Sequence, residues 1–447
     1  AVEISQSNTL IQTWKCLDRL TQNTLEFANS FNTDLMTDTR DWALSLARQS
    51  RAALDELVFL APWVVLPAAP DGFDDFPVQG AIPTLRELAK LGTSSLVSVQ
   101  RVGTAKPAER QWQSEFQRSL TVAGLRASSR IAEIERLAAL AARFACMEFD
   151  FLYDKTSRLL AIGYNVAELR RDASYYDLLA SEARLINFVA IALGHVPQES
   201  WFALGRLLTT AGGKPILLSW SGSMFEYLMP LLVMPTFENS LLDQTYKAAV
   251  ARQIEYGRQR GVPWGMSESG YNLVDVHLTY QYRAFGVPGL GLKRGLAEDL
   301  VIAPYASALA LMVEPEEACL NLQRLETLGL AGKFGLFEAI DYTPARQRRG
   351  ESSTVVRSYM AHHQGMSLLA LAHLLLDRQM QKRFASDPLF QATLVLLQER
   401  VPRATVPFAH TTQLSDRRPA SSVPEPPIRV FNSPDTATPE VQLLSNG

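Results

Sequence analysis

The chain has 447 residues, of which 47% are hydrophobic and 20% are charged, a composition typical of globular proteins and enough chain for one large domain or two. Its formal net charge is −3, and no stretch interleaves basic with aromatic residues, which excludes nucleic acid as a partner. No apolar run reaches the roughly 18 to 20 residues of a membrane span. The three cysteines are widely spaced and suggest neither a disulfide framework nor a metal site.

The first 146 residues are predicted to be helical. Apolar residues recur at spacings of three and four over 44–59 and 131–144, which is the periodicity of amphipathic helices. A proline-rich break at 62–83 divides this region. A new organisation begins near residue 147. Two short apolar or aromatic runs flank a polar turn within residues 149–165, and this pattern predicts a β-hairpin.

The pattern after the hairpin predicts many helices. The segments between them are rich in glycine, tryptophan and tyrosine, which favours an α-barrel whose loops build a cleft at one end. From residue 401 proline, serine and threonine dominate, and we expect an extended tail over 401–447. The predicted helices cover residues 173–193, 198–210, 224–234, 241–260, 303–313, 315–328, 354–377 and 388–400.

Glu182 is the first candidate for chemistry. In the helix predicted over 173–193 it has two leucines before it and a leucine and an isoleucine after it at contact spacing, so we expect it on the buried face, with Arg184 on the polar face. A buried carboxylate needs a partner. Either it pairs with an arginine such as Arg171 or Arg206, or it is a tuned cleft acid of the kind that glycosidases use.

Glu268 is the second candidate and Glu226 the third. Glu268 stands in a loop between glycines, with Trp264 and Tyr271 nearby; aromatic faces stack on sugars, and glycines let a backbone approach a ligand. A loop glutamate can equally be a solvated side chain. Glu226 follows Ser223 in the S-x-x-E spacing of a capping box, so a structural role competes with chemistry.

Other polar residues suit substrate binding. Glu338 and Asp341 lie in an aromatic loop and are expected to hold substrate hydroxyls. His362 and His363 are adjacent, so on a helix their side chains diverge by about 100 degrees. Adjacent histidines lack the spacing of a helical metal site. We therefore expect no metal and no cofactor.

An ordered set of unusual strings covers residues 147–376. It comprises FDFLYD, GYN, DASYYDLLASEARL, SWSGSMFEYLMP, VPWGMSESGYN, YQYRAFGVPGLGLKRGL, VIAPYASALA, AIDYTPAR and YMAHHQGMS. Together these strings resemble the central region of bacterial cyclic β-1,2-glucan synthases. The tail, which ends in LLSNG, is similar to the stretch that precedes the phosphorylase-like domain of those proteins.

The resemblance implies an all-α fold, an (α/α)6-barrel at residues 147–400, with the helices of residues 1–146 packing around it. It implies a transglycosylase that closes linear β-1,2-glucan into a ring with two catalytic glutamates, which match Glu182 and Glu268. A retaining mechanism fits this reaction. We expect Glu182 as nucleophile and Glu268 as acid/base, and the reverse assignment stays open. The partners it implies are the glucan and the glycosyltransferase and phosphorylase-like domains of the same parent chain. The parent would lie at the cytoplasmic side of the inner membrane, and the isolated domain would be soluble.

The same resemblance suggests how the glucan is held. Aromatic rings would act as sugar platforms and polar side chains as hydroxyl partners. An endo-β-1,2-glucanase and a non-catalytic glucan-binding scaffold remain alternatives. The expected platforms are Trp220, Tyr227, Trp264, Tyr271, Tyr280 and Tyr342, and the expected polar contacts are Glu226, Arg283, Glu338, Asp341, Arg346, His362, His363 and Gln364.

Overall fold

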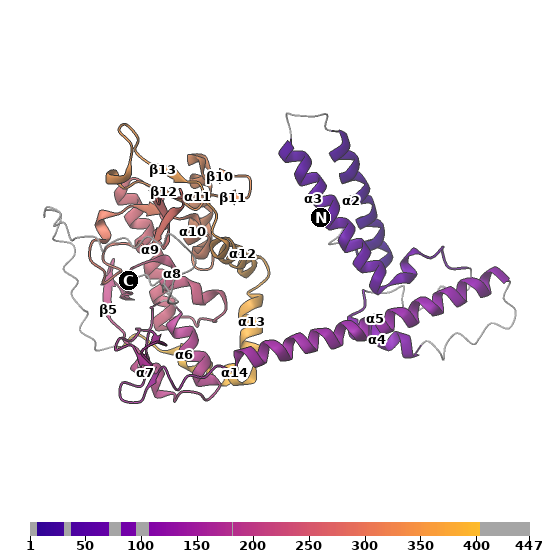
Figure 1. Cartoon of the computed structure of the whole chain (residues 1–447), viewed down its shortest axis with the longest axis horizontal. Coiled ribbons are helices and arrows are strands. Elements are labelled where there is room, and N and C mark those ends of the chain that lie inside the picture. The colour runs from indigo at the N-terminus through magenta and orange to yellow at the C-terminus, as the bar shows by residue number, and fades with distance from the viewer. Residues whose placement is uncertain (1–6, 31–36, 71–81, 95–106, 181, 403–447) are drawn as a thin grey trace. The chain divides into compact units, whose positions relative to one another are not determined.

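The computed structural model describes residues 7–30, 37–70, 82–94, 107–180 and 182–402, and the statements below concern these residues. The chain divides into two compact units, residues 1–147 and 148–447, which are described separately (Figure 1). The predicted tail lies outside the described residues from position 403 on. Within the described ranges, none of the helices combines the length and the apolar character that crossing a membrane requires.

The first unit is built from helix pairs. Helix α2 packs against α3, and α4 packs against α5, around a small core that includes Trp63, Phe116 and Leu120. Thr84 and Glu87 exchange hydrogen bonds at the start of α4, which is a capping box. The helices are α2 (Leu10–Ser30), α3 (Thr37–Leu60), α4 (Leu85–Ser94) and α5 (Pro107–Ala145), with a 3₁₀ turn at Pro62–Val65.

The second unit is mainly helical, as predicted. Helix α10 is buried along its whole length and packs against α8, α11 and α12, so it forms the centre of the large core (Figure 1). The number of helices in a barrel stays a prediction. The helices are α6 (Ala183–Ala192), α7 (Glu199–Ala203), α8 (Met224–Leu228), α9 (Leu241–Arg260), α10 (Pro304–Ala310), α11 (Pro315–Leu325), α12 (Ala361–Leu375), α13 (Gln379–Ser386) and α14 (Pro388–Thr393).

Short antiparallel strands join these helices. The expected hairpin at 149–165 is confirmed as the pair β1 and β2, and a three-stranded sheet has the order β13-β12-β9. The strands are β1 (Tyr153–Asp154), β2 (Leu159–Leu160), β3 (Tyr164–Asn165), β4 (Arg170–Arg171), β5 (Leu208–Ala211), β6 (Lys214–Leu217), β7 (Ser269–Val274), β8 (Tyr280–Arg283), β9 (Val301–Ile302), β10 (Ala331–Gly332), β11 (Gly335–Leu336), β12 (Ala339–Asp341) and β13 (Thr354–Val356).

Helix α9 begins and ends where local signals place it. The Ser240 hydroxyl accepts a hydrogen bond from the Asp243 backbone N–H at 3.2 Å, and Gly261 closes the helix with a φ of 70°. A serine N-cap and a left-handed glycine satisfy backbone groups that the helix leaves open at its two ends. The predicted bounds of 241–260 are therefore confirmed.

Three predicted helices are wrong in part. The helix expected over 173–193 begins only at Ala183, because the Asp177 carboxylate accepts hydrogen bonds from the backbone N–H groups of Leu179 and Ala180 and so holds a turn instead. The last residues of 198–210 belong to the β5–β6 hairpin, which turns at two glycines of positive φ. The first residues of 354–377 form strand β13.

Candidate functional site

The loop that carries Glu268 runs from the end of α9 to β7 and is fixed by buried polar groups. Gln253 donates to the Met266 carbonyl at 2.8 Å and accepts from the Met266 N–H at 2.9 Å. The Tyr305 hydroxyl lies 2.7 Å from the Ser267 Oγ and donates to the Glu268 carbonyl at 2.9 Å. These bonds hold the backbone of Glu268, while its side chain is only partly buried.

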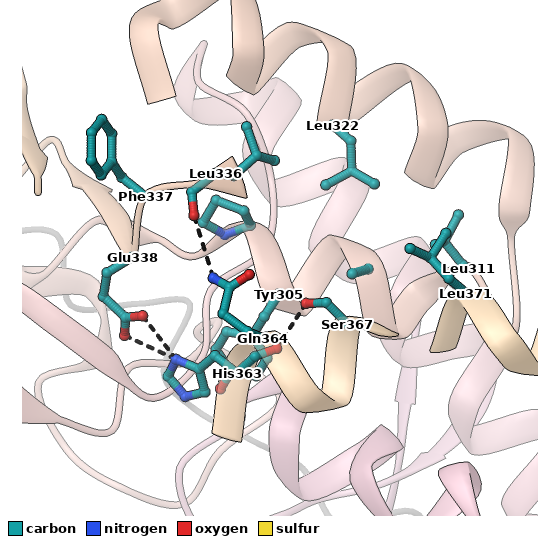
Figure 2. A pocket seen from close by; sticks show the side chains of 12 residues that line it. Tyr305, Leu311, Leu322, Leu336, Phe337, Glu338, His363, Gln364, Ser367 and Leu371 are labelled. Carbon is teal, nitrogen blue, oxygen red and sulfur yellow. Dashed lines mark hydrogen bonds and ion pairs between the residues drawn. The ribbon is translucent and has the colours of Figure 1, made fainter. Parts of the chain in front are cut away.

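Three further side chains connect to this loop from distant parts of the chain. The Glu338 carboxylate accepts the Gly270 N–H at 3.1 Å and lies 2.9 Å from Nδ1 of His363 (Figure 2). Nε2 of His363 lies 3.2 Å from the Tyr282 hydroxyl, and that hydroxyl hydrogen-bonds to the Glu268 side chain. The structure thus joins the predicted residues Glu268, Glu338 and His363 through one phenol.

The phenols around Glu268 are held in their neutral form. Burial, the negative charges of Glu268 and Glu338, and the hydrogen bond to Glu268 raise the pKa of Tyr282 well above its usual range. Burial, reinforced by Tyr282 and the two glutamates, raises the pKa of Tyr305 as well. Both hydroxyls therefore keep their protons at physiological pH and act as hydrogen-bond donors.

A cavity of about 190 Å³ lies against Glu338 and His363. Glu338, His363 and Gln364 form its polar end, and Gln364 donates to the Leu336 carbonyl at 3.4 Å (Figure 2). The remaining lining is mostly apolar and includes Leu311 and Leu371. Glu338 and His363, which are 2% and 1% exposed, therefore stand in surroundings of low polarity.

Glu182 does not lie where the helical pattern placed it. It precedes α6 as the N-cap residue and is exposed, whereas Arg184 is fully buried and donates to the carbonyls of Glu226 and Tyr227. The expected assignment of buried and polar faces is wrong because the helix begins ten residues later than predicted. The negative charge of Glu182 contributes, after burial, to a raised pKa of Tyr176.

The two arginines that we expected as possible partners of Glu182 pair with other residues. Arg206 pairs with Glu399 at 2.8 Å, and Arg171 lies 3.6 Å from Asp154. Glu268 contributes to the raised pKa values of Tyr282 and Tyr305, and Glu182 contributes to that of Tyr176. The pairing of Glu182 with Glu268 therefore stays a proposal.

Three predicted sugar contacts lie in the core instead. Glu226 completes the capping box with Ser223 and also accepts from Ser219 and Ser221. Tyr227 is 0% exposed, and its hydroxyl lies 2.9 Å and 3.0 Å from the Leu217 and Leu290 carbonyl oxygens. Trp264 is 5% exposed. These side chains present little surface to a ligand, and the sugar-binding roles expected for them stay predictions.

Asp341 and Arg346 belong to an internal ion network. Asp341 is 0% exposed and accepts from the Asn272 N–H at 3.0 Å and from Nε of Arg346 at 2.7 Å. Arg346 also pairs with Asp299 at 2.6 Å, and Asp299 pairs with Arg283. Burial alone would lower the pKa of Arg346, but its hydrogen bonds to Asp341 and Asp299 raise it above the usual value. Asp341 and Arg346 thus hold the loops around Glu268.

The remaining predicted contacts differ in how much surface they offer. Trp220 is 51% exposed and His362 is also exposed, so both can meet a ligand. The Tyr271 ring is partly covered, because the Arg346 guanidinium lies 4.9 Å from its centroid. Tyr280 and Tyr342 are half-buried, as is Gln364, while the Arg283 side chain is 45% exposed.

Sequence reasoning missed Tyr282 and Tyr305. Tyr282 follows Tyr280 by two residues on β8, a spacing that places side chains on one face of a strand. Tyr305 opens α10 behind Pro304. Among the residues that the structure describes, no group of three or more His, Cys, Asp or Glu side chains is arranged to hold a metal ion.

Comparison with known proteins gives one family model and one curated relative. The model described as "Putative glucoamylase" matches residues 174–388. The cyclic β-(1,2)-glucan synthase NdvB of Rhizobium meliloti is 47% identical over 302 residues, which are 67% of this chain and 11% of the relative. The chain therefore spans about a tenth of the length of that protein.

Two solved structures of an endo-β-1,2-glucanase from Talaromyces funiculosus also align with the chain. The complex with sophorose aligns with a TM-score of 0.42 and 11% identity over 89% of this chain and 81% of the other. A variant in complex with β-1,2-glucan gives a TM-score of 0.40 and 12% identity over 86% and 84% of the two chains. Scores this low do not by themselves establish a shared fold. By sequence, the chain is similar to a small part of a cyclic β-1,2-glucan synthase, and residues 174–388 are similar to the glucoamylase model.

Proposed function

We propose that this chain is a glycan-processing enzyme that closes linear β-1,2-glucan into a ring by retaining transglycosylation. The 47% identity with a cyclic β-(1,2)-glucan synthase supports the substrate class. The observation that carries the chemistry is the setting of Glu268, a partly buried carboxyl on a loop that Tyr305 and Glu338 fix and that Tyr282 contacts. A carboxyl held this way suits proton transfer to and from a sugar oxygen.

In the proposed mechanism Glu182 attacks the anomeric carbon while Glu268 protonates the leaving oxygen, which gives a covalent glucosyl-enzyme. Glu268 then takes the proton from the 2-hydroxyl at the non-reducing end of the same chain, and that oxygen displaces Glu182. One glycosidic bond breaks and one forms, so no nucleotide is needed. The positive end of the α6 dipole favours the negative charge that a nucleophile at Glu182 requires.

Ring closure competes with hydrolysis at the second step. The attacking hydroxyl prevails over water only where the site excludes water and holds the curved chain with its end close to the intermediate. Exposed Trp220 and the half-buried Tyr271 and Tyr280 are the proposed sugar platforms. Arg283, His362 and Gln364 are the proposed hydroxyl partners, with Glu338, His363, Asp341, Tyr342 and Arg346 supporting the walls of the site.

The proposal extends to the longer protein that this chain aligns with. We infer that a glycosyltransferase domain supplies the linear glucan and that a phosphorylase-like domain belongs to the same parent. The parent would work at the cytoplasmic side of the inner membrane. The chain spans only 11% of its curated relative, so each of these partners needs its own test.

The decisive experiment incubates the purified chain with linear β-1,2-glucan and follows digestion with an exo-acting β-glucosidase by mass spectrometry. Cyclization predicts digestion-resistant products whose masses are whole anhydroglucose units. Glu182→Gln and Glu268→Gln should each lower turnover by about 10²–10⁴-fold, whereas Glu255→Gln changes an exposed carboxylate on α9 and should leave turnover unchanged.

Each alternative function has its own outcome. Digestible oligosaccharides with new reducing ends identify a hydrolase that uses water as acceptor. Binding of glucan without any bond rearrangement by the unaltered chain identifies a scaffold. The anomeric configuration of the first products, followed by NMR, separates retention from inversion and thereby tests the covalent intermediate.

A further inference from the structure

The Tyr282 hydroxyl is a junction with one hydrogen and more than one acceptor. It hydrogen-bonds to the Glu268 side chain, lies 3.2 Å from Nε2 of His363 and lies 3.4 Å from Nε2 of His362. A phenol donates one hydrogen bond at a time and can accept others. Which neighbour accepts the hydrogen bond from Tyr282 therefore depends on the protonation states of the other neighbours.

His363 is the neighbour whose state the fold controls. Its Nδ1 lies 2.9 Å and 3.0 Å from the two Glu338 oxygens (Figure 2), and its ring is stacked on Tyr305 with centroids 3.7 Å apart. A carboxylate at Nδ1 favours the tautomer in which Nδ1 carries the hydrogen. Nε2 is then a bare acceptor that faces the Tyr282 hydroxyl.

We propose that Glu338 and His363 are positioning residues that set the acid strength of Glu268 by drawing the Tyr282 hydrogen away from it. This inference rests on the acid/base role proposed above for Glu268. With the hydrogen on Tyr282 directed at His363, the Glu268 carboxyl is favoured in its protonated form, because it can donate to the phenol oxygen. When Glu268 has given its proton to the leaving oxygen, the phenol turns and donates to the new carboxylate.

No atom is exchanged in this switch; a single hydroxyl rotates between two acceptors. The protonated form is supported before bond cleavage, and the carboxylate is supported in the covalent intermediate. The titratable groups around the junction come from several elements. They are Glu268 before β7, His362 and His363 on α12, Tyr305 on α10, Glu338 before β12 and Lys293 after β8.

The test uses the pH profile of kcat/KM on linear β-1,2-glucan, whose alkaline limb reports loss of the essential acid in the free enzyme. His363→Phe keeps the stack on Tyr305 but removes the acceptor, so the Tyr282 hydrogen turns to Glu268 and the limb moves to lower pH. Tyr282→Phe removes the donor, and the limb moves to higher pH. Each shift should be roughly one to two pH units, the value of one hydrogen bond to an ionised group.

Glu338→Gln gives a second variant with the same expected sign as His363→Phe. The amide nitrogen of the new side chain would donate to Nδ1 of His363, so the imidazole hydrogen would move to Nε2. Nε2 could then no longer accept the Tyr282 hydrogen. The matched control is His373→Gln, ten residues further along α12 and lining a different cavity, which should leave the profile in place. Equal thermal stability of the variants excludes a general loss of folding.

Opposite shifts in the Tyr282 and His363 variants support the inference. Shifts of the same sign, or no shift, overturn it, and so does a move to higher pH in His363→Phe, which would mean that the imidazole carries both hydrogens. Nitrogen-15 NMR of the labelled histidines tests the tautomer without substrate. If the unaltered chain leaves glucan untouched, the proposed function fails, and this spectrum still tests the arrangement at His363: a hydrogen on Nε2 contradicts it.

Discussion

The imidazole of His363 lies flat on the phenol ring of Tyr305, with centroids 3.7 Å apart and planes inclined by 9°. His363 comes from α12 and Tyr305 from α10, two helices that pack along each other. The same phenol reaches the Glu268 carbonyl, and the same imidazole reaches Glu338. This stack therefore connects the core of the second unit to the loop that presents Glu268.

Removing one oxygen from Tyr305 tests that connection. Tyr305→Phe keeps the ring on His363 but deletes the hydrogen bonds to Ser267 and the Glu268 carbonyl. A displacement of a catalytic group by about 1 Å can cost about 10²-fold in rate. We therefore expect kcat on linear β-1,2-glucan to fall by ten- to a hundred-fold, with KM little changed.

The matched control for this change is Tyr227→Phe. Tyr227 is also buried, and its hydroxyl also lies within hydrogen-bond distance of two oxygens, the carbonyls of Leu217 and Leu290, so its loss of stability should be similar, at about 1–3 kcal/mol. Its kcat per folded molecule should stay unchanged. Equal losses of kcat in both variants would mean that Tyr305 acts only through folding stability.

Asp341→Asn should destabilise the second unit strongly. The buried carboxylate accepts from the N–H groups of Asn272 and Thr343 and from Arg346, and an amide would turn a donor toward these donors. Breaking a buried ion pair by removing one charge costs about 3–5 kcal/mol. The measurement is the free energy of unfolding from urea denaturation, with Asp275→Asn as control.

Asp275 is exposed and accepts from the backbone N–H groups of His277 and Thr279. Asparagine supports the same turn through its side-chain oxygen, so we expect a change below about 0.5 kcal/mol. A loss at Asp341 as small as that at Asp275 would contradict the buried network.

Local signals explain which elements could be predicted from sequence. The bounds of α9 follow from Ser240 and Gly261, which are contiguous with the helix they close. The start of α6 could not be predicted from periodicity, because the Asp177 side chain competes for the backbone upstream. The β5–β6 hairpin carried its own signal in Gly212 and Gly213, whose positive φ values suit a two-residue turn.

The candidate site was predictable only in part. Glu268 was found because glycines and aromatic residues flank it in sequence. The partners that define its surroundings, Tyr282, Glu338 and His363, come from segments far apart in the chain, and no spacing rule joins them. The burial of Trp264 and Tyr227 could not be predicted, because a large aromatic ring suits a core as well as a sugar platform.

Two glycine substitutions should have opposite effects on stability. A Cβ added at Gly286 would lie 1.9 Å from the Ser221 carbonyl oxygen, which forces the backbone apart and should cost more than about 3 kcal/mol or prevent folding. At Gly365, inside α12, an added Cβ would meet no heavy atom within 4 Å. Alanine there should stabilise by about 0.5–1 kcal/mol, because glycine is the poorer helix former.

Thermal melts of Gly286→Ala and Gly365→Ala against the unaltered chain check both signs. A tolerated Gly286→Ala would contradict the close approach of the two backbone segments. A destabilising Gly365→Ala would mean that this face of α12 is covered in solution.

Acid should destabilise the second unit through His373. Burial, reinforced by the positive charge of Arg378, lowers the pKa of His373 below its usual value of 6.5. The folded state therefore binds this proton less readily than the unfolded state does, so the stability that the neutral imidazole provides is present above pH 6.5 and is lost as the pH falls through the folded value. His362 has the same sign, because burial and the neighbouring His363 lower its pKa.

We therefore expect the melting temperature to fall between pH 7.5 and pH 5, and His373→Gln to reduce that fall. Arg378→Gln removes the positive charge beside His373 and should reduce the fall of the melting temperature by a smaller amount. Calorimetric melts across this range give the slope of melting temperature against pH for each variant. At pH 8 the imidazole is neutral in the folded and in the unfolded state, so its titration does not change the melting temperature there. A steeper fall of the melting temperature in His373→Gln would contradict this prediction. It would mean that the folded protein stabilises the protonated imidazole, and the ring would then need an acidic partner in place of Arg378.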